Sequence, residues 1–382
     1  MRGHPWIFSG SIANITGSEA ERQPGQTVKV VDSTDKFLAW GALSPESNIR
    51  VRVWSQVEDS IISPEFLLRR ISKAVKSRDN YFHAEEFNAY RLVHGESDGL
   101  PGLIVDKYAK SLVVQFLACG VEYWRETIVK QLAGLLYCEQ IYERSDADVR
   151  RLEGLEPRKG LLMGRKMNPI EIKEGDRDYF VDVIQGQKTG FFLDQRENRA
   201  VIQDLAGHKV VLDCFAYTGG FSVAAMKGGA QHVTALDASS RALQMGEKNL
   251  QLNNIPGKHV EMIEVDVFSQ LRKFRDAGRT FDMIILDPPK FAPTAAHAQK
   301  AARGYKDINL LAFKLLNPGG LLATFSCSGG VSAELFQKIV AGAALDAEVD
   351  AKIIRKLGPG VDHPVALNFP EGAYLKGFII QV

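Results

Sequence analysis

The stretch Val210-Val-Leu-Asp213-Cys-Phe-Ala-Tyr-Thr218-Gly219-Gly220-Phe221 decides the fold. It begins with a continuous apolar run, which is typical of a strand buried on both faces of a parallel sheet. An aspartate follows that run, and two adjacent glycines then let the backbone pass close to a ligand and open a helix. The stretch contains no GxGxxG, GKT or GKS sequence, so the dinucleotide and triphosphate interpretations both weaken.

The same pattern continues outward from this stretch toward the end of the sequence. Further apolar runs, separated by helical segments, lie at residues 233–236, 260–263, 283–286 and 321–325. Two more strands are expected within residues 351–382, the last of them at 377–382. Alternation of this kind predicts an α/β domain with a parallel sheet covered on both faces, which we place at residues 181–382.

Acidic residues also follow the second and third strands of this predicted sheet. The second strand ends at Asp237, where a carboxylate can accept hydrogen bonds from ribose hydroxyls, and the third ends at Asp266, where it can accept from an adenine amino group. A lone aspartate at a strand end is usually a turn or helix-cap residue. Three aspartates at successive strand ends instead favour a ligand site at the carboxyl edge.

The fourth strand is followed by Asp287-Pro288-Pro289-Lys290-Phe291. Two prolines fix the backbone and withhold two donors, so Asp287 and the neighbouring carbonyls can face a planar substrate. A rigid strand-to-loop turn without a substrate is the alternative for this motif.

The fifth strand ends in Ser326-Cys327-Ser328-Gly329-Gly330, on the same edge as Asp287. Carbon 5 of cytosine is a poor nucleophile until a thiolate adds to carbon 6, so a cysteine at this place suggests covalent catalysis. Asp287 would hold the pyrimidine and assist protonation at its nitrogen edge. Cys119, Cys138 and Cys214 are interpreted as inert small hydrophobic residues.

Residues 1–62 read as a small β-barrel with strands at 27–31, 37–40 and 49–54. Arg50 and Arg52 alternate with valines, which suggests one polar face that could meet RNA phosphates. From Arg50 to Arg78 there are seven cations and three acids. This stripe is either a phosphate-binding surface or a solvated helix face, and the net charge of +1 excludes a strongly basic nucleic-acid binder.

We expect residues 63–180 to form a linking helix and a small central α/β domain. Ser63 and Pro64 predict a helix start, and the helix is expected to run to about Phe82. Strands are expected at 90–93, 102–106, 112–117 and 140–143, an amphipathic helix at 124–136, a surface loop at 146–166 and a strand at 179–183.

The composition is that of an ordinary globular enzyme. The 382 residues are 45% hydrophobic and 24% charged, and there is no apolar run long enough to span a membrane. The four cysteines have no metal-ligand spacing, which predicts neither a disulfide framework nor a metal site and favours a cytoplasmic enzyme.

The three strand-end aspartates and the Gly-Gly turn resemble the S-adenosylmethionine site of the Rossmann-like class I methyltransferases. The whole chain further resembles the bacterial 23S ribosomal RNA cytosine carbon-5 methyltransferases of the large-subunit methyltransferase I family. The likeness extends to residues 4–10 and 95–102, and the segments that carry it stand in that family's order at 190–196, 214–221, 287–291, 304–309, 325–329 and 370–377.

The resemblance implies an N-terminal PUA barrel, a central α/β domain, a methyltransferase domain and S-adenosyl-L-methionine as cofactor. The implied cofactor-binding residues are Phe192, Asp194, Arg196, Asp213, Phe215, Thr218, Gly219, Gly220, Asp237, Asp266, Val267 and Asp287. Cys327 and Asp287 are the implied catalytic residues, and the substrate-binding set is Pro288, Pro289, Lys290, Tyr305, Lys306, Arg50 and Arg52.

The substrate implied is 23S ribosomal RNA that is naked or only partly assembled, and whether the protein forms a homodimer stays open. Many RNA cytosine carbon-5 methyltransferases carry a second cysteine near the Asp-Pro-Pro motif, where this sequence has Lys290-Phe291. That second cysteine aids product release, so release must here use another group. The base that removes the carbon-5 proton is not identified by the sequence either. His363 is one candidate, although a lone histidine before a proline is more often structural. A base-nitrogen RNA methyltransferase and a non-catalytic ribosomal RNA-binding assembly factor are the alternative functions.

Overall fold

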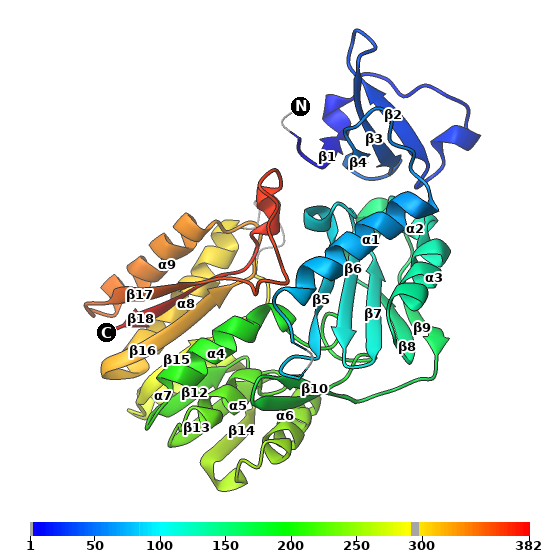
Figure 1. Cartoon of the computed structure of the whole chain (residues 1–382). Helices are drawn as coiled ribbons and strands as arrows, with labels where there is room; N and C mark the ends of the chain where they lie inside the picture. Colours follow the sequence, from blue (N-terminus) through cyan, green and yellow to red (C-terminus); the bar gives the residue numbers. More distant parts are fainter. Residues whose placement is uncertain (1–2, 84, 292–297) are drawn as a thin grey trace. The chain divides into compact units, whose positions relative to one another are not determined.

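The chain divides into two compact units in the computed structural model, which describes residues 3–83, 85–291 and 298–382 (Figure 1). Unit 1 comprises Met1–Glu174, Val181–Leu193 and Val361–Gly372, and unit 2 comprises Gly175–Phe180, Asp194–Gly360 and Ala373–Val382. Each unit is therefore built from segments that lie far apart in the sequence.

Unit 1 begins with a four-stranded antiparallel sheet. Its strands are β1 (Trp6–Phe8), β2 (Thr27–Val31), β3 (Phe37–Leu43) and β4 (Ile49–Ser55), in the order β1-β4-β3-β2. Val51, Val53 and Trp54 of β4 are buried, whereas Arg50 and Arg52 are half-buried. The predicted alternation is therefore present from Arg50 to Val53, but it stops at Trp54, which is buried although it stands at the same alternate position as the two arginines.

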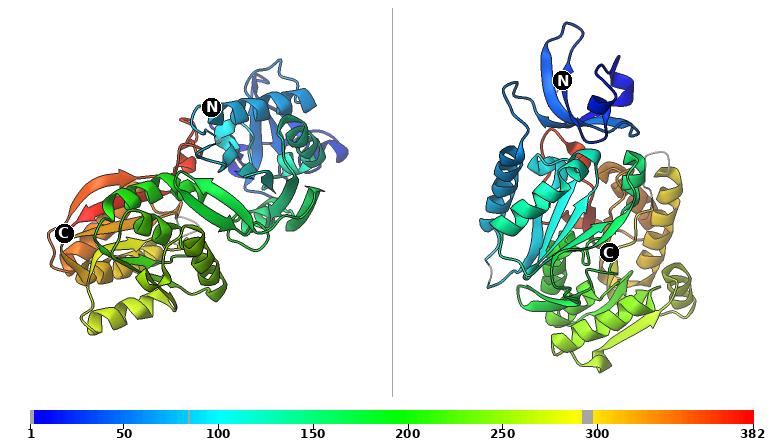
Figure 2. Two further views of the ribbon diagram at one scale, coloured as in Figure 1. Left: turned by 60° about the horizontal axis from the view of Figure 1, so that its bottom comes forward. Right: turned by 90° about the vertical axis from the view of Figure 1, so that its right-hand side faces the viewer.

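The second part of unit 1 contains a five-stranded sheet in the order β5-β6-β7-β8-β9, made of β5 (Ala89–His94), β6 (Leu103–Tyr108), β7 (Ser111–Phe116), β8 (Gln140–Ser145) and β9 (Arg158–Gly164). Its helices are α1 (Pro64–Asp79), α2 (Cys119–Tyr123) and α3 (Arg125–Leu135). Helices α1 and α3 lie side by side on one face of the sheet (Figure 2), and their apolar sides share a core with it.

Helix α1 starts where the sequence predicts, because the Ser63 side chain accepts a hydrogen bond from the Phe66 amide at 3.4 Å and Pro64 takes the first helical position. It ends at Asp79 rather than near Phe82. The surface loop expected at 146–166 is wrong, because a 3-10 helix at Asp148–Glu153 and strand β9 lie there. β9 is an edge strand with glycine at 160 and 164, which hid its pattern.

Strands β10 (Ile170–Glu174) and β11 (Arg177–Val181) pair in a separate two-stranded sheet. The strand expected at 179–183 therefore begins two residues earlier and ends at Val181.

Unit 2 is built on a seven-stranded sheet with the order β14-β13-β12-β15-β16-β18-β17. Its strands are β12 (Val210–Cys214), β13 (His232–Asp237), β14 (Val260–Glu264), β15 (Phe281–Leu286), β16 (Leu316–Ser326), β17 (Lys352–Leu357) and β18 (Lys376–Gln381). The first five are parallel to one another, and β18 is antiparallel to both of its neighbours. The predicted α/β domain is thus confirmed, with β18 inserted between β16 and β17.

Among the residues that the structure describes, six helices cover this sheet in two layers. One layer contains α4 (Arg196–Leu205), α5 (Gly220–Lys227) and α6 (Ser240–Leu252), which contact one another in that order. The other contains α7 (Val267–Asp276), α8 (Ala298–Leu315) and α9 (Ala333–Asp346) (Figure 1). None of the helices among the described residues is long and apolar enough to cross a membrane.

Candidate functional site

The candidate site lies where the strand order of unit 2 reverses. After β12, the chain adds β13 and β14 on one side and β15 and β16 on the other, so the switch point lies between β12 and β15. Ligands of open α/β sheets bind at the carboxyl ends of strands at such a point. Asp213 is the penultimate residue of β12, and Asp287 follows β15 directly.

Asp213 is a buried carboxyl with one oxygen engaged inside the protein. It is 1% exposed, and its Oδ2 accepts a hydrogen bond from the Ser222 hydroxyl at 2.6 Å. Burial raises the pKa of Asp213 to about 7, and the charges of Asp287 and Asp237 act in the same direction. The hydrogen bond from Ser222 lowers this pKa, but its effect is smaller than that of burial. A cationic ligand beside this carboxyl would remove that penalty.

Two buried oxygens lie at this edge, Asp213 Oδ1 and Thr218 Oγ1. Neither has a hydrogen-bond partner among the described residues. Buried polar atoms in folded proteins are normally paired, so orphaned acceptors of this kind fit a ligand that supplies the missing donors. The α-ammonium group and the sulfonium of S-adenosylmethionine are positively charged, and both suit a carboxylate that is otherwise costly to ionise. The residues present therefore fit this cofactor.

The loop after β12 is held in an unusual backbone conformation. Phe215, Tyr217 and Gly219 have φ values of 63°, 50° and 73°, which lie in the left-handed region that favours glycine. The Tyr217 amide donates to Asp237 Oδ2 at 2.8 Å, and the Asn249 side chain donates to the Thr218 carbonyl at 2.9 Å. Such strain persists only where the surroundings hold it, and it is common at ligand sites.

The other two strand-end aspartates have different surroundings. Asp237 is half-buried, and both of its oxygens accept backbone amides, from Tyr217 and from Ser239, at 2.8 Å each. Asp266 is exposed and caps helix α7 through one oxygen, which accepts the Ser269 amide at 2.9 Å. Asp266 therefore has the helix-cap role that the sequence left open, while its assignment to adenine stays a prediction.

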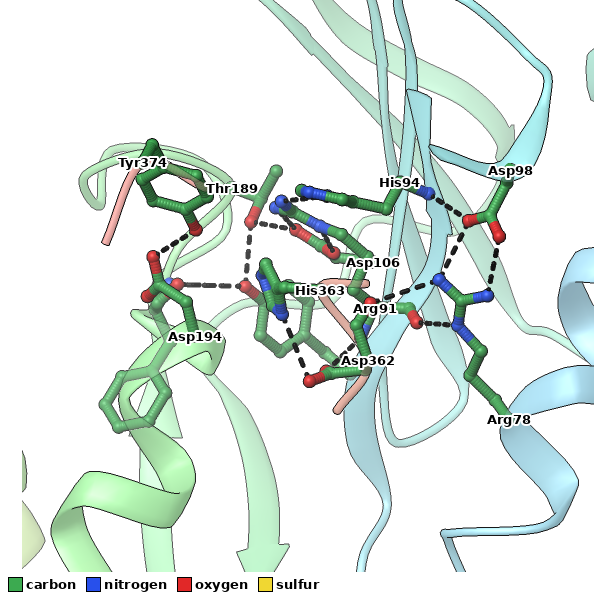
Figure 3. A network of polar contacts seen from close by, with 12 residues as sticks. Arg78, Arg91, His94, Asp98, Asp106, Thr189, Asp194, Asp362, His363 and Tyr374 are labelled. Carbon is green, nitrogen blue, oxygen red and sulfur yellow. Dashed lines mark hydrogen bonds and ion pairs between the residues drawn. The ribbon is translucent and has the colours of Figure 1, made fainter. Parts of the chain in front are cut away.

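The segment before α4 divides between the two units. Asp194 and Arg196 are buried in unit 2, where Asp194 Oδ2 accepts the Tyr374 hydroxyl at 2.5 Å (Figure 3) and its carbonyl accepts the Gly360 amide at 3.0 Å. Phe192 belongs to unit 1, where the Lys188 ammonium lies 4.4 Å from its ring centroid. Their roles toward the cofactor remain predictions.

The loop that carries Cys327 is fastened by hydroxyl groups. Tyr305, from α8, is fully buried, and its hydroxyl lies 3.0 Å from the side-chain oxygens of both Ser326 and Ser328. Burial raises the pKa of Tyr305, and the charge of Cys327 contributes in the same direction. The phenol thus braces the two residues that flank Cys327.

A residue that sequence analysis missed completes this cluster. Lys376, the first residue of β18, is 7% exposed, and its Nζ donates to the Ser328 carbonyl at 2.7 Å. Burial lowers the pKa of Lys376 to about 8, and Lys290 adds to this effect, while Cys327 opposes it. The available sequence signal was a lysine directly before the largely apolar run Gly377–Ile380, near the end of the segment 370–377.

Cys327 differs from the other cysteines. Cys119 and Cys214 are buried, and burial raises the pKa of Cys119 to about 11 and that of Cys214 well above its usual range. Their interpretation as inert hydrophobic residues is consistent with these surroundings. Cys327 is half-exposed at the carboxyl edge of β16. The described residues include no group of three or more His, Cys, Asp or Glu side chains that could hold a metal ion.

The predicted substrate residues beside Asp287 vary in exposure. Pro288 is buried, whereas Pro289 and Lys290 are exposed. The ring of Phe291 lies 4.8 Å from that of Tyr305, measured between centroids. Lys306 pairs with Asp346 at 2.7 Å on the surface.

Several cations of the 50–78 stripe point into unit 1 rather than toward a ligand. Arg52 pairs with Glu96 at 2.8 Å and with Glu153 at 3.0 Å. Arg78 is buried and donates to both oxygens of Asp98, at 2.8 Å each (Figure 3). Both Arg52 and Arg78 therefore have carboxylate partners inside the fold. Of the two arginines predicted to bind phosphate, Arg50 is better placed than Arg52, because it is half-buried and lines a hollow of the first domain.

His363, the candidate base, lies in the part of unit 1 contributed by Val361–Gly372. It is buried, and its Nδ1 lies 3.0 Å from an oxygen of the neighbouring Asp362, whose other oxygen accepts the Arg91 amide at 2.8 Å (Figure 3). These contacts favour the structural interpretation of His363.

Comparisons with known proteins give a consistent result. Residues 157–345 match a family described as S-adenosylmethionine-dependent methyltransferase, and residues 1–56 match a PUA-like domain. The chain is 48% identical over 383 aligned residues to the ribosomal RNA large subunit methyltransferase I of Shewanella frigidimarina and 47% identical over 382 residues to that of Shewanella denitrificans, covering 100% of this chain and 96% of each relative.

A solved structure described as a SAM-dependent methyltransferase from Streptococcus mutans shares the fold. It superposes with a TM-score of 0.86 at 23% identity, covering 100% of this chain and 96% of that one. The family matches confirm that the chain contains a methyltransferase domain and a PUA-like domain, while the predicted bounds of these domains stay predictions.

Proposed function

This chain belongs to the ribosomal RNA large subunit methyltransferase I family, and from that membership we propose that it methylates carbon 5 of a cytosine in 23S ribosomal RNA through a covalent adduct with Cys327. S-adenosylmethionine-dependent methylation of ribosomal RNA follows from the family. The position of the methyl group and the use of the cysteine go beyond it.

The observation that carries the proposal is the position of Cys327. Strand β16 pairs with β15 so that Thr324 lies opposite Leu286, the residue before Asp287. Cys327 and Asp287 thus follow neighbouring parallel strands at the same edge, beside the switch point that holds Asp213. A half-exposed thiol at this edge supports covalent catalysis, because methylation of a base nitrogen needs no nucleophile from the protein.

The proposed reaction uses two side chains of this chain. The Cys327 thiolate forms a bond from Sγ to carbon 6, and the electron pair of the 5,6 double bond moves to carbon 5. Asp287 holds the nitrogen edge of the pyrimidine while this charge develops. S-adenosylmethionine, when bound, supplies the methyl group to carbon 5. A proton then leaves carbon 5, the double bond re-forms, and the Sγ–carbon bond breaks to return the thiolate.

The RNA would be held by the PUA-like domain, which residues 1–56 match. A cytosine inside a helix cannot present carbon 5 to a thiol at a sheet edge, so the target base must be flipped out or already unpaired. We therefore expect 23S RNA that is naked or partly assembled as substrate. The reaction would take place in the cytoplasm, and a homodimer stays an open possibility.

The test is transfer of tritium from labelled S-adenosylmethionine to 23S RNA that lacks the modification, with the product mapped by mass spectrometry. We expect 5-methylcytosine with the natural chain and none with Cys327→Ser. A second measurement uses RNA that contains 5-fluorocytosine, because fluorine cannot leave as the proton does. The adduct should accumulate and appear as RNA mass on the Cys327 peptide.

Near-normal turnover by Cys327→Ala would contradict the covalent route and favour methylation of a guanine or adenine nitrogen. Absence of transfer by the natural chain, with RNA still bound, would favour an assembly factor without chemistry. Cofactor binding by the Cys327 variants, measured by calorimetry, is the control, because loss of binding would indicate a folding defect.

A further inference from the structure

Lys376 and Cys327 lie close together because of the register between β16 and β18. The backbone of Lys376 lies opposite that of Ser326 in the antiparallel pair. Its side chain then reaches past this position, and Nζ donates to the carbonyl of Ser328 at 2.7 Å. Lys376 is therefore held beside both neighbours of Cys327. Its backbone pairs with Ser326 in the sheet, and its ammonium group donates to Ser328.

The environment of this lysine is unfavourable for a positive charge. Its side chain is almost completely removed from water. In addition, the exposed cation Lys290, which lies in the loop after β15, repels the ammonium charge. Burying an ammonium group costs free energy unless a partner compensates for it. A neutral apolar residue would fill this position of the sheet at lower cost, so the lysine calls for a functional explanation.

Two titratable side chains respond to the charge of Cys327, and they come from different elements: Lys376 from β18 and the Tyr305 phenol from α8. A third group, Lys290 in the loop after β15, acts on Lys376. The negative charge of a Cys327 thiolate raises the pKa of Lys376, which means that the ammonium and the thiolate attract each other. This interaction is reciprocal, so the ammonium favours the thiolate by the same free energy.

We propose that the ammonium group of Lys376 is the counter-charge that holds Cys327 in its thiolate form. Lys376 is then a positioning residue that acts through Cys327, and the inference deepens the function proposed above and rests on it. In the free enzyme the Cys327 S–H bond breaks, its electron pair stays on Sγ and the proton goes to water. At pH 7, below its pKa of about 8, the lysine keeps its three protons.

The direct test is the pH dependence of Cys327 alkylation by iodoacetamide, followed by mass spectrometry of each cysteine peptide. No RNA or cofactor is present, so the measurement does not depend on the reaction proposed above. Cys138 is half-exposed and lies in unit 1, where burial raises its pKa, and it is the internal reference. In the natural chain, Cys327 should reach half-maximal rate at least one pH unit below Cys138.

Two variants separate charge from hydrogen bonding. Lys376→Met removes both, whereas Lys376→Gln keeps a donor for the Ser328 carbonyl without the charge. Both should raise the alkylation midpoint of Cys327 by about one pH unit or more, which lowers its rate at pH 7 about tenfold. Lys356→Met is the matched control, because Lys356 is an exposed lysine of the adjacent strand β17, opposite Phe378, and it should leave the midpoint unchanged.

Natural reactivity in Lys376→Gln would overturn the proposal, since the hydrogen bond alone would then explain the lysine. A midpoint of Cys327 at or above that of Cys138 in the natural chain would overturn it even if the Lys376 variants fail to fold. Alkylation of buried Cys119 or Cys214 in the native state would reveal such a folding failure.

The pH profile of methyl transfer gives a second readout. In Lys376→Met, turnover should be lost at pH 7 and partly recover as the pH rises and the thiol ionises unaided. A merely structural role of Lys376 would give a defect that pH does not rescue. If Cys327→Ala remains active while the alkylation results hold, the proposed function fails and the coupling of Lys376 to Cys327 stands.

Discussion

Replacing Asp213 by asparagine should stabilise the ligand-free protein at high pH while weakening its binding of S-adenosylmethionine. The carboxyl is 1% exposed, and one of its oxygens has no partner among the described residues. Asparagine is close in shape and can still accept the hydrogen bond from the Ser222 hydroxyl. It removes the charge that burial and the neighbouring carboxylates oppose.

The magnitude follows from the pKa of this carboxyl, which burial raises from 3.8 to about 7. Because this pKa is higher in the folded than in the unfolded protein, protonated Asp213 favours folding. That contribution to the unfolding free energy is complete below the unfolded-state pKa and is lost as the pH rises through the folded-state pKa. About three pKa units correspond to a cost of about 4 kcal/mol above pH 7. A buried asparagine N–H without a partner costs about 1–3 kcal/mol, which leaves a net gain of roughly 1–3 kcal/mol at pH 8.

The assay is urea unfolding of the ligand-free protein at pH 8 and at pH 5. At each pH, the unfolding free energy of the natural chain is subtracted from that of the variant. That difference should fall by about 2–3 kcal/mol from pH 8 to pH 5, where most folded molecules carry a protonated Asp213. Asp282→Asn is the control, because both oxygens of Asp282 accept hydrogen bonds, from Val210 and Asn317, so this variant should lose stability.

The reasoning about Asp213 would be refuted by an Asp213→Asn variant that is less stable than the natural chain by the same amount at both pH values. Unchanged affinity for S-adenosylmethionine in calorimetry would instead refute its role as the acceptor that faces the cofactor.

Three further substitutions have expected outcomes. Asp237→Ala should weaken cofactor binding by about 1–3 kcal/mol in calorimetry, since hydrogen bonds to a charged group are lost; unchanged affinity would contradict its assignment to the ribose. Gly377→Ala should destabilise unit 2 by about 1–3 kcal/mol in thermal unfolding, because a Cβ there would lie 2.4 Å from a ring carbon of Phe325. Arg52→Met should cost about 3 kcal/mol, because it leaves Glu153 buried without its cation; an unchanged melting temperature would show that the pair is not needed.

Much of the fold could be predicted because its strands are apolar and its turns carry clear signals. The runs that begin at Val210 and Val233 became central strands with nearly the expected bounds. Strand β9 was missed because none of its residues from Arg158 to Gly164 is buried, so the segment shows no alternation of apolar and polar positions. Periodicity reports burial, and it is silent where a strand is exposed.

The site was predictable only where side chains follow strand ends in sequence order. Asp213 and Asp287 meet because neighbouring parallel strands end at one edge. The partner of Cys327 could not be found this way, because Lys376 comes from a strand that runs in the opposite direction and enters the sheet after β17. Nor could sequence show that Arg52 is already neutralised by two glutamates.

The insertion of β18 between β16 and β17 has a consequence for synthesis on the ribosome. While β17 emerges, the strand that ends beside Cys327 has an open edge, and β17 has no neighbour to pair with. A nascent chain that stops short of Lys376 therefore lacks the ammonium group proposed above as the counter-charge of Cys327. On that proposal, the cysteine would become a strong nucleophile only when the final strand inserts.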